Sequence, residues 1–243
     1  MRIWGITDTG LVRRENQDAY ATAVIADCTV AVVCDGMGGT NGGHMASTIA
    51  VDTLLEKLRD TFRPDMEQAQ VKNAVLQGIA QANDAIRAKA AEDETLVNMG
   101  TTMVCAVCRD NEALVFNVGD SRGYLIGESG IRQITRDHSV VENMVEKGDI
   151  TPQEARRHPS RNLITRALGP DIQAQADTFS VPWKQGDFIL LCTDGLVNTV
   201  SDQEMLFEVL HDGDIESCLD HLLQISLQRG APDNITAVLL MNA

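Results

Sequence analysis

The sequence predicts an α+β fold in a single domain, residues 1–243, with strands in two blocks separated by helices. Three observations support this prediction. Short apolar runs alternate with turn residues in the first third of the chain and again beyond residue 100. Apolar residues at helical spacing lie between the two blocks. No repeat, linker or low-complexity tract divides the 243 residues, a length that suits one large domain.

The first strand block comprises Arg2–Thr7, Ala19–Ala26 and Thr29–Cys34, and the third run reads Thr-Val-Ala-Val-Val-Cys. Such an apolar run predicts a strand that is buried on both faces. Two amphipathic helices are expected after the glycine-rich segment Gly36–Gly43, each with one face packed on a sheet. Their apolar positions are Met45, Ile49, Leu54, Leu55, Leu58 and Phe62 in the first helix, and Val71, Val75, Ile79, Ala82 and Ile86 in the second.

The second strand block contains Thr101–Arg109, Ala113–Val118 and Arg122–Ile126, joined by short turns. Turns of this length favour antiparallel pairing of successive strands. Two further strands are expected at Phe188–Thr193 and Ile235–Met241, close to the end of the sequence.

Capping boxes predict three helix starts in the later part of the chain. The paired residues are Ser139 with Glu142, Thr151 with Glu154, and Ser201 with Glu204. Pro152 follows Thr151 at the first helical position, where a missing N–H costs nothing. A last helix, which should end at Gly230, is marked by Ile215, Leu219, Leu222 and Ser226.

The net charge is −15, from 35 acidic and 20 basic residues. A nucleic-acid backbone would be repelled by this field, so nucleic acid is not an expected partner. An acidic protein that handles phosphate needs bound cations or a local arginine to overcome its own charge. The composition, 44% hydrophobic with 4% aromatic residues, suits an ordinary core of aliphatic side chains.

Cysteine usage indicates a reduced, cytoplasmic protein. The cysteines lie mostly inside apolar runs, at Cys28, Cys34, Cys105, Cys108, Cys192 and Cys218. Cys105 and Cys108 spell C-x-x-C, but residues three apart in a strand face opposite sides, so the pair should not chelate one ion. The sequence shows no signal peptide and no apolar stretch of the roughly 18 residues that span a membrane. No membrane partner is therefore expected.

Acidic residues recur beside the expected strands, and they are the main candidates for chemistry: Asp18, Asp35, Asp120, Asp194 and Asp233. Carboxylates that converge at strand ends would repel one another unless cations lay between them. Oxygen ligands without clustered His or Cys select hard ions, that is Mg²⁺, Mn²⁺ or Ca²⁺. Each Asp-Gly pair taken alone is equally consistent with an ordinary turn.

The glycines after Asp35 sharpen this interpretation. Gly36 has no Cβ, so its carbonyl could come within bonding distance of a cation. The run Gly36–Gly43 could also suggest a phosphate-binding P-loop, but it lacks the terminal Gly-Lys-Ser/Thr of that motif. We therefore reject a nucleotide-binding loop.

Together the motifs resemble the PPM/PP2C phosphatases, and in particular their compact bacterial branch. Six segments stand in the order and approximate spacing of that family: Arg13–Asp18, Asp35–Gly39, Gly100–Thr102, Val118–Arg122, Thr193–Gly195 and Asp233–Asn234. The resemblance runs from Thr7 to the last strand. It implies a four-layer α-β-β-α sandwich of two antiparallel sheets flanked by helices, which agrees with the strand blocks above.

The resemblance also implies roles for individual residues. Asp35 would bridge two main metal ions, Asp194 and Asp233 would complete the first site, and the Gly36 carbonyl would serve the second. Asp18 would hold metal-bound waters or ligate directly. Asp120 would bind a third ion together with Asp194. The cofactor would be two or three Mn²⁺ or Mg²⁺ ions.

The resemblance assigns the substrate phosphate to Arg13, whose planar guanidinium suits a bidentate contact. Arg14 is interpreted as a solvated surface charge. Two residues depart from the family pattern. Gln17 stands where some relatives have a glutamate that reaches the second metal. Met37 follows Asp-Gly where eukaryotic relatives have a histidine that is thought to protonate the leaving group, so the proton must come from elsewhere.

Two further features remain open. His138, next to Ser139, is interpreted as part of a turn that caps the following helix. The cluster Arg156, Arg157, His158 and Arg161 lies in Thr151–Leu163, where the family has a mobile flap. This cluster is equally consistent with a solvated helix end and with contact to a phosphopeptide.

The expected activity is hydrolysis of phosphoserine or phosphothreonine in proteins, without a covalent intermediate. A water bridging two metals would attack phosphorus in line, with Arg13 and the metals stabilising the charge. No cysteine is followed six residues later by arginine, which disfavours a cysteine phosphatase. The alternatives are a catalytically silent binding module and a phosphatase dedicated to one regulatory protein. The expected partners are a bacterial Ser/Thr kinase and its substrates, and a monomer is expected.

Overall fold

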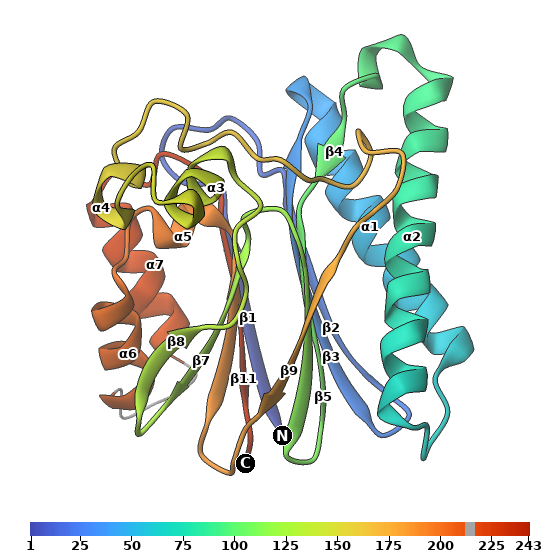
Figure 1. Ribbon diagram of the computed structural model, residues 1–243, viewed down its shortest axis with the longest axis vertical. Helices are drawn as coiled ribbons and strands as arrows, with labels where there is room; N and C mark the ends of the chain where they lie inside the picture. Colours follow the sequence, from blue (N-terminus) through green and yellow to red (C-terminus); the bar gives the residue numbers. More distant parts are fainter. Residues whose placement is uncertain (212–216) are drawn as a thin grey trace.

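The computed structural model describes residues 1–211 and 217–243, and it contains two antiparallel β-sheets packed face to face, with helices on both outer faces (Figure 1). The α+β prediction is confirmed, and so is the four-layer α-β-β-α sandwich. In the described ranges, no helix is both long enough and apolar enough to cross a membrane.

One sheet, called sheet A here, has its last strand in sequence between two others. Every neighbouring pair in it is antiparallel. The strand order is β1 (Arg2–Asp8), β11 (Ile235–Met241), β10 (Phe188–Cys192), β7 (Arg122–Gly127) and β8 (Gly130–Gln133). The two ends of the sequence therefore pair with each other along β1 and β11.

The other sheet, sheet B, is also antiparallel throughout. Its strand order is β2 (Asp18–Ile25), β3 (Cys28–Met37), β5 (Met103–Arg109), β6 (Glu112–Val118) and β9 (Asp177–Pro182), and β4 (Gly100–Thr101) pairs with the end of β3. The predicted strand Thr101–Arg109 is thus divided. Thr102 interrupts it because its amide and hydroxyl bond the backbone of Asp35 on β3.

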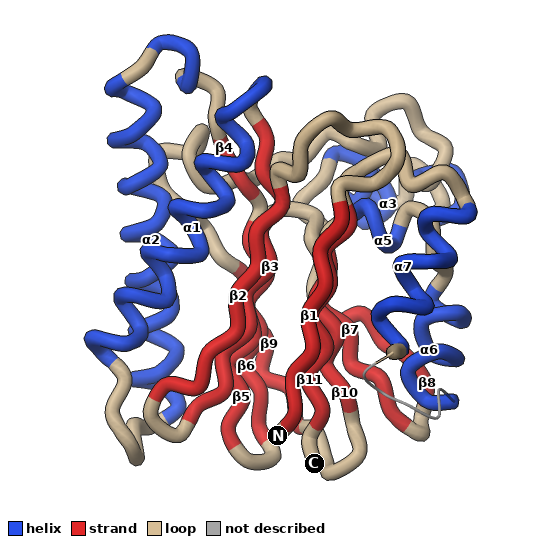
Figure 2. Tube along the Cα trace, turned by 180° about the vertical axis from the view of Figure 1, so that it is seen from behind, coloured by secondary structure: helices blue, strands red, loops and turns tan. Residues whose placement is uncertain are grey.

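Helices cover the outer face of each sheet (Figures 1 and 2). Sheet B carries α1 (Gly39–Thr61) and α2 (Gln68–Glu92), and a 3-10 turn, η1 (Glu94–Leu96), follows them. Sheet A carries α5 (Asp194–Val197), α6 (Asp202–His211) and α7 (Cys218–Gln228). Two shorter helices, α3 (Val140–Lys147) and α4 (Pro152–Ala155), lie in the connection from β8 to β9.

The core has three layers of buried side chains, one between the sheets and one under each helical layer. β3 supplies two of these layers: Val30 and Val32 face the helices, whereas Ala31 and Val33 face the other sheet. This confirms the prediction that the Thr29–Cys34 strand is buried on both faces. The C-x-x-C cysteines also face opposite sides, as expected, because Cys105 packs under the helices and Cys108 packs between the sheets.

The first helix begins earlier than its apolar spacing suggests, at Gly39 within the glycine-rich segment. The reason is a close approach of two backbones. A Cβ on Gly36 would collide with the carbonyl oxygen of Gly43, and a Cβ on Gly43 would lie 2.7 Å from the Gly36 carbonyl. The helix can therefore start against the end of β3 only because both positions lack a side chain.

Two strands, β8 and β9, were not predicted from the sequence. β8 has only four residues, and β9 is an edge strand on which Val181 is the one buried residue. Neither contains the apolar run that signals a strand.

The three predicted capping boxes are formed wholly or in part. Thr151 and Ser201 each form the complete reciprocal box, whereas at Ser139 only half of the box forms: the Glu142 amide donates to the Ser139 hydroxyl.

The last predicted helix is confirmed as α7, which is capped by Arg229 and followed by Gly230. Ile215, which helped to mark that helix, lies outside the described residues.

The directions of the strands show at which end of the sandwich the candidate aspartates lie. β1 starts and β11 finishes at the same end of the sandwich, so the start of β11 lies at the opposite end (Figure 2). The end of β3, where α1 begins, lies at that opposite end too (Figure 1).

Candidate active site

A cleft of about 630 Å³ opens at the end of the sandwich where β3 finishes and β11 begins. Residues from both sheets and from the loops above them line it. Of the predicted site residues, Arg13, Asp35, Gly36, Asp120, Asp194 and Asp233 contribute to its walls. Asp18 lies beneath them, because it pairs directly with Asp35 in the β2–β3 ladder. The sequence therefore identified residues that the fold does bring together.

Asp18 and Asp35 are partners in antiparallel register, which places their side chains on the same face of sheet B. Asp18 is 6% exposed, and its Oδ2 accepts a 3.0 Å hydrogen bond from the hydroxyl of Thr193. Its other oxygen, Oδ1, is buried without a hydrogen-bond partner. A buried carboxylate oxygen without a donor is free to accept a bond from a water molecule or a cation.

The backbone of Asp35 is fixed by the two threonines of the Gly100–Thr102 motif. The Asp35 amide donates to Thr102 Oγ1 at 3.0 Å, and the Asp35 carbonyl accepts from the Thr101 hydroxyl at 2.8 Å and from the Thr102 amide at 2.9 Å. Thr102 Oγ1 also lies 2.7 Å from Ser121 Oγ, beside Asp120. This hydroxyl pair links two of the candidate ligands, a role that the sequence motif did not reveal.

Asp194 is the first residue of α5, directly after β10. Its Oδ2 accepts a 3.1 Å hydrogen bond from Asn198 Nδ2 one turn later, whereas its Oδ1 is buried without a partner. Asp233 lies just before β11, and its Oδ1 accepts from the Asn234 amide at 2.9 Å. Thus sheet A presents two carboxylates across the cleft from those of sheet B.

Arg13 forms an ion pair with Asp233, with 2.7 Å between its guanidinium nitrogen and Asp233 Oδ2. Both groups are partly exposed, at 56% for the arginine side chain and 30% for the aspartate. The predicted phosphate ligand therefore holds a predicted metal ligand in this structure. Arg14 also lines the cleft, although the sequence suggested only a solvated charge.

Asn234 fixes the loop that carries Arg13. The sequence did not reveal this role of Asn234. Its side-chain oxygen accepts from the Gln17 amide at 2.9 Å, and its side-chain nitrogen donates to the carbonyls of Thr9 at 2.9 Å and Glu15 at 3.0 Å. One buried amide thereby fixes both ends of this loop. The motif Asp233–Asn234 was recognised, but its second residue has partners more than 200 positions away.

The two departures from the family pattern have clear structural settings. Gln17 donates a 2.6 Å hydrogen bond to the Gly39 carbonyl at the start of α1. Met37 lines the cleft, where its thioether has no proton to give. Gly36 is required by packing, since a Cβ there would strike the carbonyls of Gly43 and Gln17. Its metal-ligand role stays a prediction.

The carboxylates raise one another's pKa. Burial comes first and repulsion second: together they raise the pKa of Asp18 and Asp120 to about 7, and that of Asp35 well above its ordinary value. The pKa of Asp194 is also raised, by burial and then by the charge of Asp233. A positive charge among these four acids would favour their ionised forms.

Hard divalent cations fit this donor set. The candidate ligands are carboxylate oxygens, and two of these oxygens, on Asp18 and Asp194, have no protein partner. Within residues 1–211 and 217–243, no group of three or more Asp, Glu, His or Cys side chains is already arranged so that it could hold a metal ion. The Asp233 carboxylate is already paired with the Arg13 guanidinium.

The basic cluster of the Thr151–Leu163 segment does not line the cleft. Asn162 does, as does Ile164 just beyond the segment, whereas Arg156, Arg157 and Arg161 are exposed to solvent. The ring of His138 is not part of the cleft wall either.

Comparison with known proteins agrees with this geometry. The family model described as protein phosphatase 2C matches residues 12–239. The serine/threonine phosphatase stp of Listeria welshimeri is 34% identical over 235 residues, covering 96% of this chain and 93% of that protein. The protein phosphatase PhpP of Streptococcus pneumoniae is 34% identical, covering 99% and 97%. The crystal structure of Stp1 from Staphylococcus aureus has a TM-score of 0.90 at 36% identity, covering 98% of this chain and 94% of that one.

Proposed function

Because this chain belongs to the protein phosphatase 2C family and is a protein serine/threonine phosphatase, we propose that the cleft between its two sheets is the catalytic centre. The observation that carries this assignment is the pair of buried oxygens without partners, Asp18 Oδ1 and Asp194 Oδ1, among acids of raised pKa. The family is metal-dependent, and cations would satisfy both oxygens and relieve the repulsion.

Each carboxylate has a proposed place around two or three ions, Mn²⁺ or Mg²⁺. Asp35 would bind two of them, because it pairs with Asp18 on its own sheet and feels the charge of Asp194 on the other. Asp194 and Asp233 would complete the first site, and Asp120 would contribute to a third together with Asp194. The electrostatic coupling of Asp35 to all four of the others supports the central position of Asp35.

Asp18 and Gly36 complete the second site. Asp18 has one oxygen held by Thr193 and one free to face a cation or its water shell. The carbonyl of Gly36 belongs to the part of β3 that pairs with β4 and lines the cleft. With a neutral Gln17 bonded to the Gly39 carbonyl, the second ion would depend on Asp35, Gly36 and the water that Asp18 holds.

Arg13 is the proposed phosphate ligand. Its guanidinium reaches the cleft, where it pairs with the Asp233 carboxylate, which would bind a metal ion when ions are present. Once released from Asp233, the planar fork offers two parallel N–H donors to phosphate oxygens. The guanidinium thus exchanges one anion for another without leaving the cleft.

Bound divalent cations supply an acidified water as nucleophile and neutralise the phosphate charge. The chain supplies the frame: the Thr101 and Thr102 hydroxyls hold Asp35, and Asn234 holds the loop of Arg13. No proton donor for the leaving oxygen is assigned to position 37, where Met37 stands.

We propose that the substrates are proteins phosphorylated by a bacterial Ser/Thr kinase, which this phosphatase opposes. The relatives with this activity come from bacteria. A cytoplasmic site of action suits the six buried cysteines. We further propose that residues 1–243 act as one domain and as a monomer.

Hydrolysis of p-nitrophenyl phosphate tests the metal assignment. The protein is stripped with EDTA, dialysed, and titrated with Mn²⁺ and separately with Mg²⁺, with Asp35→Asn as the matched control. EDTA treatment should abolish activity. Adding either Mn²⁺ or Mg²⁺ should restore activity in the wild type but not in Asp35→Asn. Full turnover in excess EDTA would overturn the mechanism. A panel of phosphoserine and phosphothreonine proteins then tests the substrate class, with phosphotyrosine as the comparison.

A further inference from the structure

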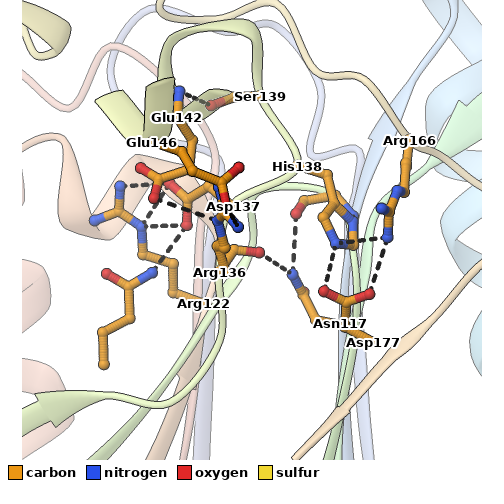
Figure 3. A network of polar contacts seen from close by, with 12 residues as sticks. Asn117, Arg122, Arg136, Asp137, His138, Ser139, Glu142, Glu146, Arg166 and Asp177 are labelled. Atoms are coloured by element: carbon orange, nitrogen blue, oxygen red, sulfur yellow. Dashed lines mark hydrogen bonds and ion pairs between the residues drawn. The ribbon is translucent and has the colours of Figure 1, made fainter. Parts of the chain in front are cut away.

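His138 is buried, at 6% exposure, where three segments meet: the loop after β6, the approach to α3 and the strand β9 (Figure 3). The sequence suggested that it helps to cap α3. Ser139 alone provides that cap, because its hydroxyl accepts from the Glu142 amide at 3.1 Å. The imidazole of His138 instead contacts the Gly119 amide and the Asp177 carboxylate.

The imidazole and backbone of His138 hold Gly119 from both sides. The His138 amide donates to the Gly119 carbonyl at 2.9 Å, and His138 Nδ1 accepts from the Gly119 amide at 3.1 Å. Asn117 Nδ2 adds a 3.0 Å bond to the same carbonyl. Since the amide can only donate, Nδ1 carries no proton, and the proton of the neutral ring is on Nε2.

The far side of the ring is oriented by Asp177. His138 Nε2 lies 3.3 Å from Asp177 Oδ2, and Arg166 donates to Asp177 Oδ1 at 2.9 Å (Figure 3). The same Arg166 nitrogen lies 3.1 Å from His138 Nε2. The Asp177 carboxylate therefore accepts from both the Arg166 guanidinium and the protonated Nε2 of His138. Burial and then the charge of Arg166 lower the pKa of His138, although Asp177 opposes them, and the neutral ring keeps Nδ1 free to accept.

Gly119 needs external support because of its own conformation. Its φ is +104°, a region that residues with a side chain rarely adopt, and a Cβ there would lie 2.5 Å from Thr102 Cγ2. No sheet ladder covers it, because β6 ends at Val118. The next residue is Asp120. The direction of the Asp120 carboxylate therefore depends on how the Gly119 peptide is held.

We propose that His138 is a positioning residue for Asp120: with Asp177 and Arg166 behind it, it fixes the Gly119 peptide and so aims the Asp120 carboxylate into the cleft. This inference rests on the proposed role of Asp120 as a metal ligand. Residues that orient metal ligands typically change metal affinity by about tenfold to a hundredfold when they are lost. His138 itself touches neither metal nor substrate.

Two substitutions separate the halves of the ring. His138→Asn keeps an acceptor near the position of Nδ1 and loses the contact to Asp177. His138→Gln keeps a polar group near Nε2 and removes the acceptor for Gly119. Asp120→Asn defines the metal site in question. Arg136→Gln is the control, because the Arg136 side chain pairs with Glu142 and Glu146 at the surface and not with Gly119.

Two measurements are made on each metal-free protein: Mn²⁺ binding by calorimetry, and exchange of the Gly119 amide proton by NMR. His138→Gln should speed the exchange and weaken, by about tenfold to a hundredfold, only the Mn²⁺ site that Asp120→Asn also weakens. The double variant that combines His138→Gln with Asp120→Asn should bind Mn²⁺ no more weakly than Asp120→Asn alone. His138→Asn and Arg136→Gln should resemble the wild type in both measurements.

Other outcomes would overturn the inference in distinguishable ways. Wild-type Mn²⁺ binding by His138→Gln, with fast Gly119 exchange, would mean that the hydrogen bond does not aim Asp120. Equal weakening of every Mn²⁺ site would mean that His138 supports the fold in general. If Asp120→Asn leaves every Mn²⁺ site unchanged, the proposed role of Asp120 fails, and the inference fails with it.

Discussion

Replacing Arg13 with alanine should separate phosphate recognition from metal binding, because the structure gives this residue two competing anions. In the metal-free protein its partner is Asp233, 2.7 Å away. During hydrolysis we expect its partner to be the substrate phosphate. Arg13→Ala removes both contacts, and the two losses should have opposite signs in two different assays.

The magnitudes follow from exposure and charge. A lost charge-assisted hydrogen bond to phosphate is worth roughly 1.5–3 kcal/mol, so kcat/KM should fall by about tenfold to a hundredfold. The ion pair with Asp233 is half-exposed, and pairs of this kind are worth at most about 1 kcal/mol. Its loss frees Asp233, so Mn²⁺ should bind slightly more tightly, by up to about fivefold.

The assays are steady-state hydrolysis of a phosphoprotein at saturating Mn²⁺ and calorimetric titration of the metal-free protein with Mn²⁺. Arg13→Lys should recover part of kcat/KM, because a point charge replaces only part of a two-pronged contact. Arg14→Ala is the matched comparison at the same cleft wall and should lose less. Weaker Mn²⁺ binding by Arg13→Ala would refute the competition. A larger loss in Arg14→Ala would move the phosphate contact to that residue.

Three further predictions concern the carboxylates and their frame. Asp35→Asn should abolish most hydrolysis and raise the urea midpoint of the metal-free protein, because it removes a carboxyl group whose pKa burial and the neighbouring carboxylates raise well above its ordinary value; a near wild-type turnover would contradict the bridging role. Between about pH 4 and 7 the folded metal-free protein retains protons on Asp18 and Asp120 that the unfolded chain releases. Its free energy of unfolding should therefore fall as pH rises through this window and then level off, which urea titrations at several pH values would check; a rise across the window would contradict the raised pKa values of Asp18 and Asp120. Thr102→Val should cost roughly 1–3 kcal/mol of unfolding free energy and weaken Mn²⁺ binding, because the Asp35 amide and Ser121 lose their hydroxyl partner, whereas Thr102→Ser should be close to wild type.

Local patterns predicted most of the fold. The Thr29–Cys34 run became a strand buried on both faces, because its uninterrupted apolar sequence already signals such a strand. The Thr151 and Ser201 boxes became helix starts, because the capping contacts lie within a few residues. Edge strands such as β9 escaped prediction since half-exposed residues carry no apolar signal. The start of α1 escaped it because two glycines, Gly36 and Gly43, meet through space.

The candidate site shows the same division. Carboxylates beside strands were recognisable from the sequence, and the strand register brings Asp18 directly opposite Asp35. The partners of Arg13 and His138 were not predictable. Arg13 pairs with a residue 220 positions away, and the His138 ring bonds a glycine 19 positions earlier in preference to the adjacent helix. Only the packing of the two sheets brings these groups together.

The position of β11 in the middle of sheet A has a consequence for biosynthesis. This strand is inserted between β1 and β10, so sheet A stays split until residues 235–241 have left the ribosome. Asp233, which precedes the strand, and Asn234, which secures the loop of Arg13, arrive with it. A nascent chain would therefore carry Asp18, Asp35 and Asp120 without a working centre until β11 is in place. Hydrolytic capacity would switch on abruptly when the final strand is inserted.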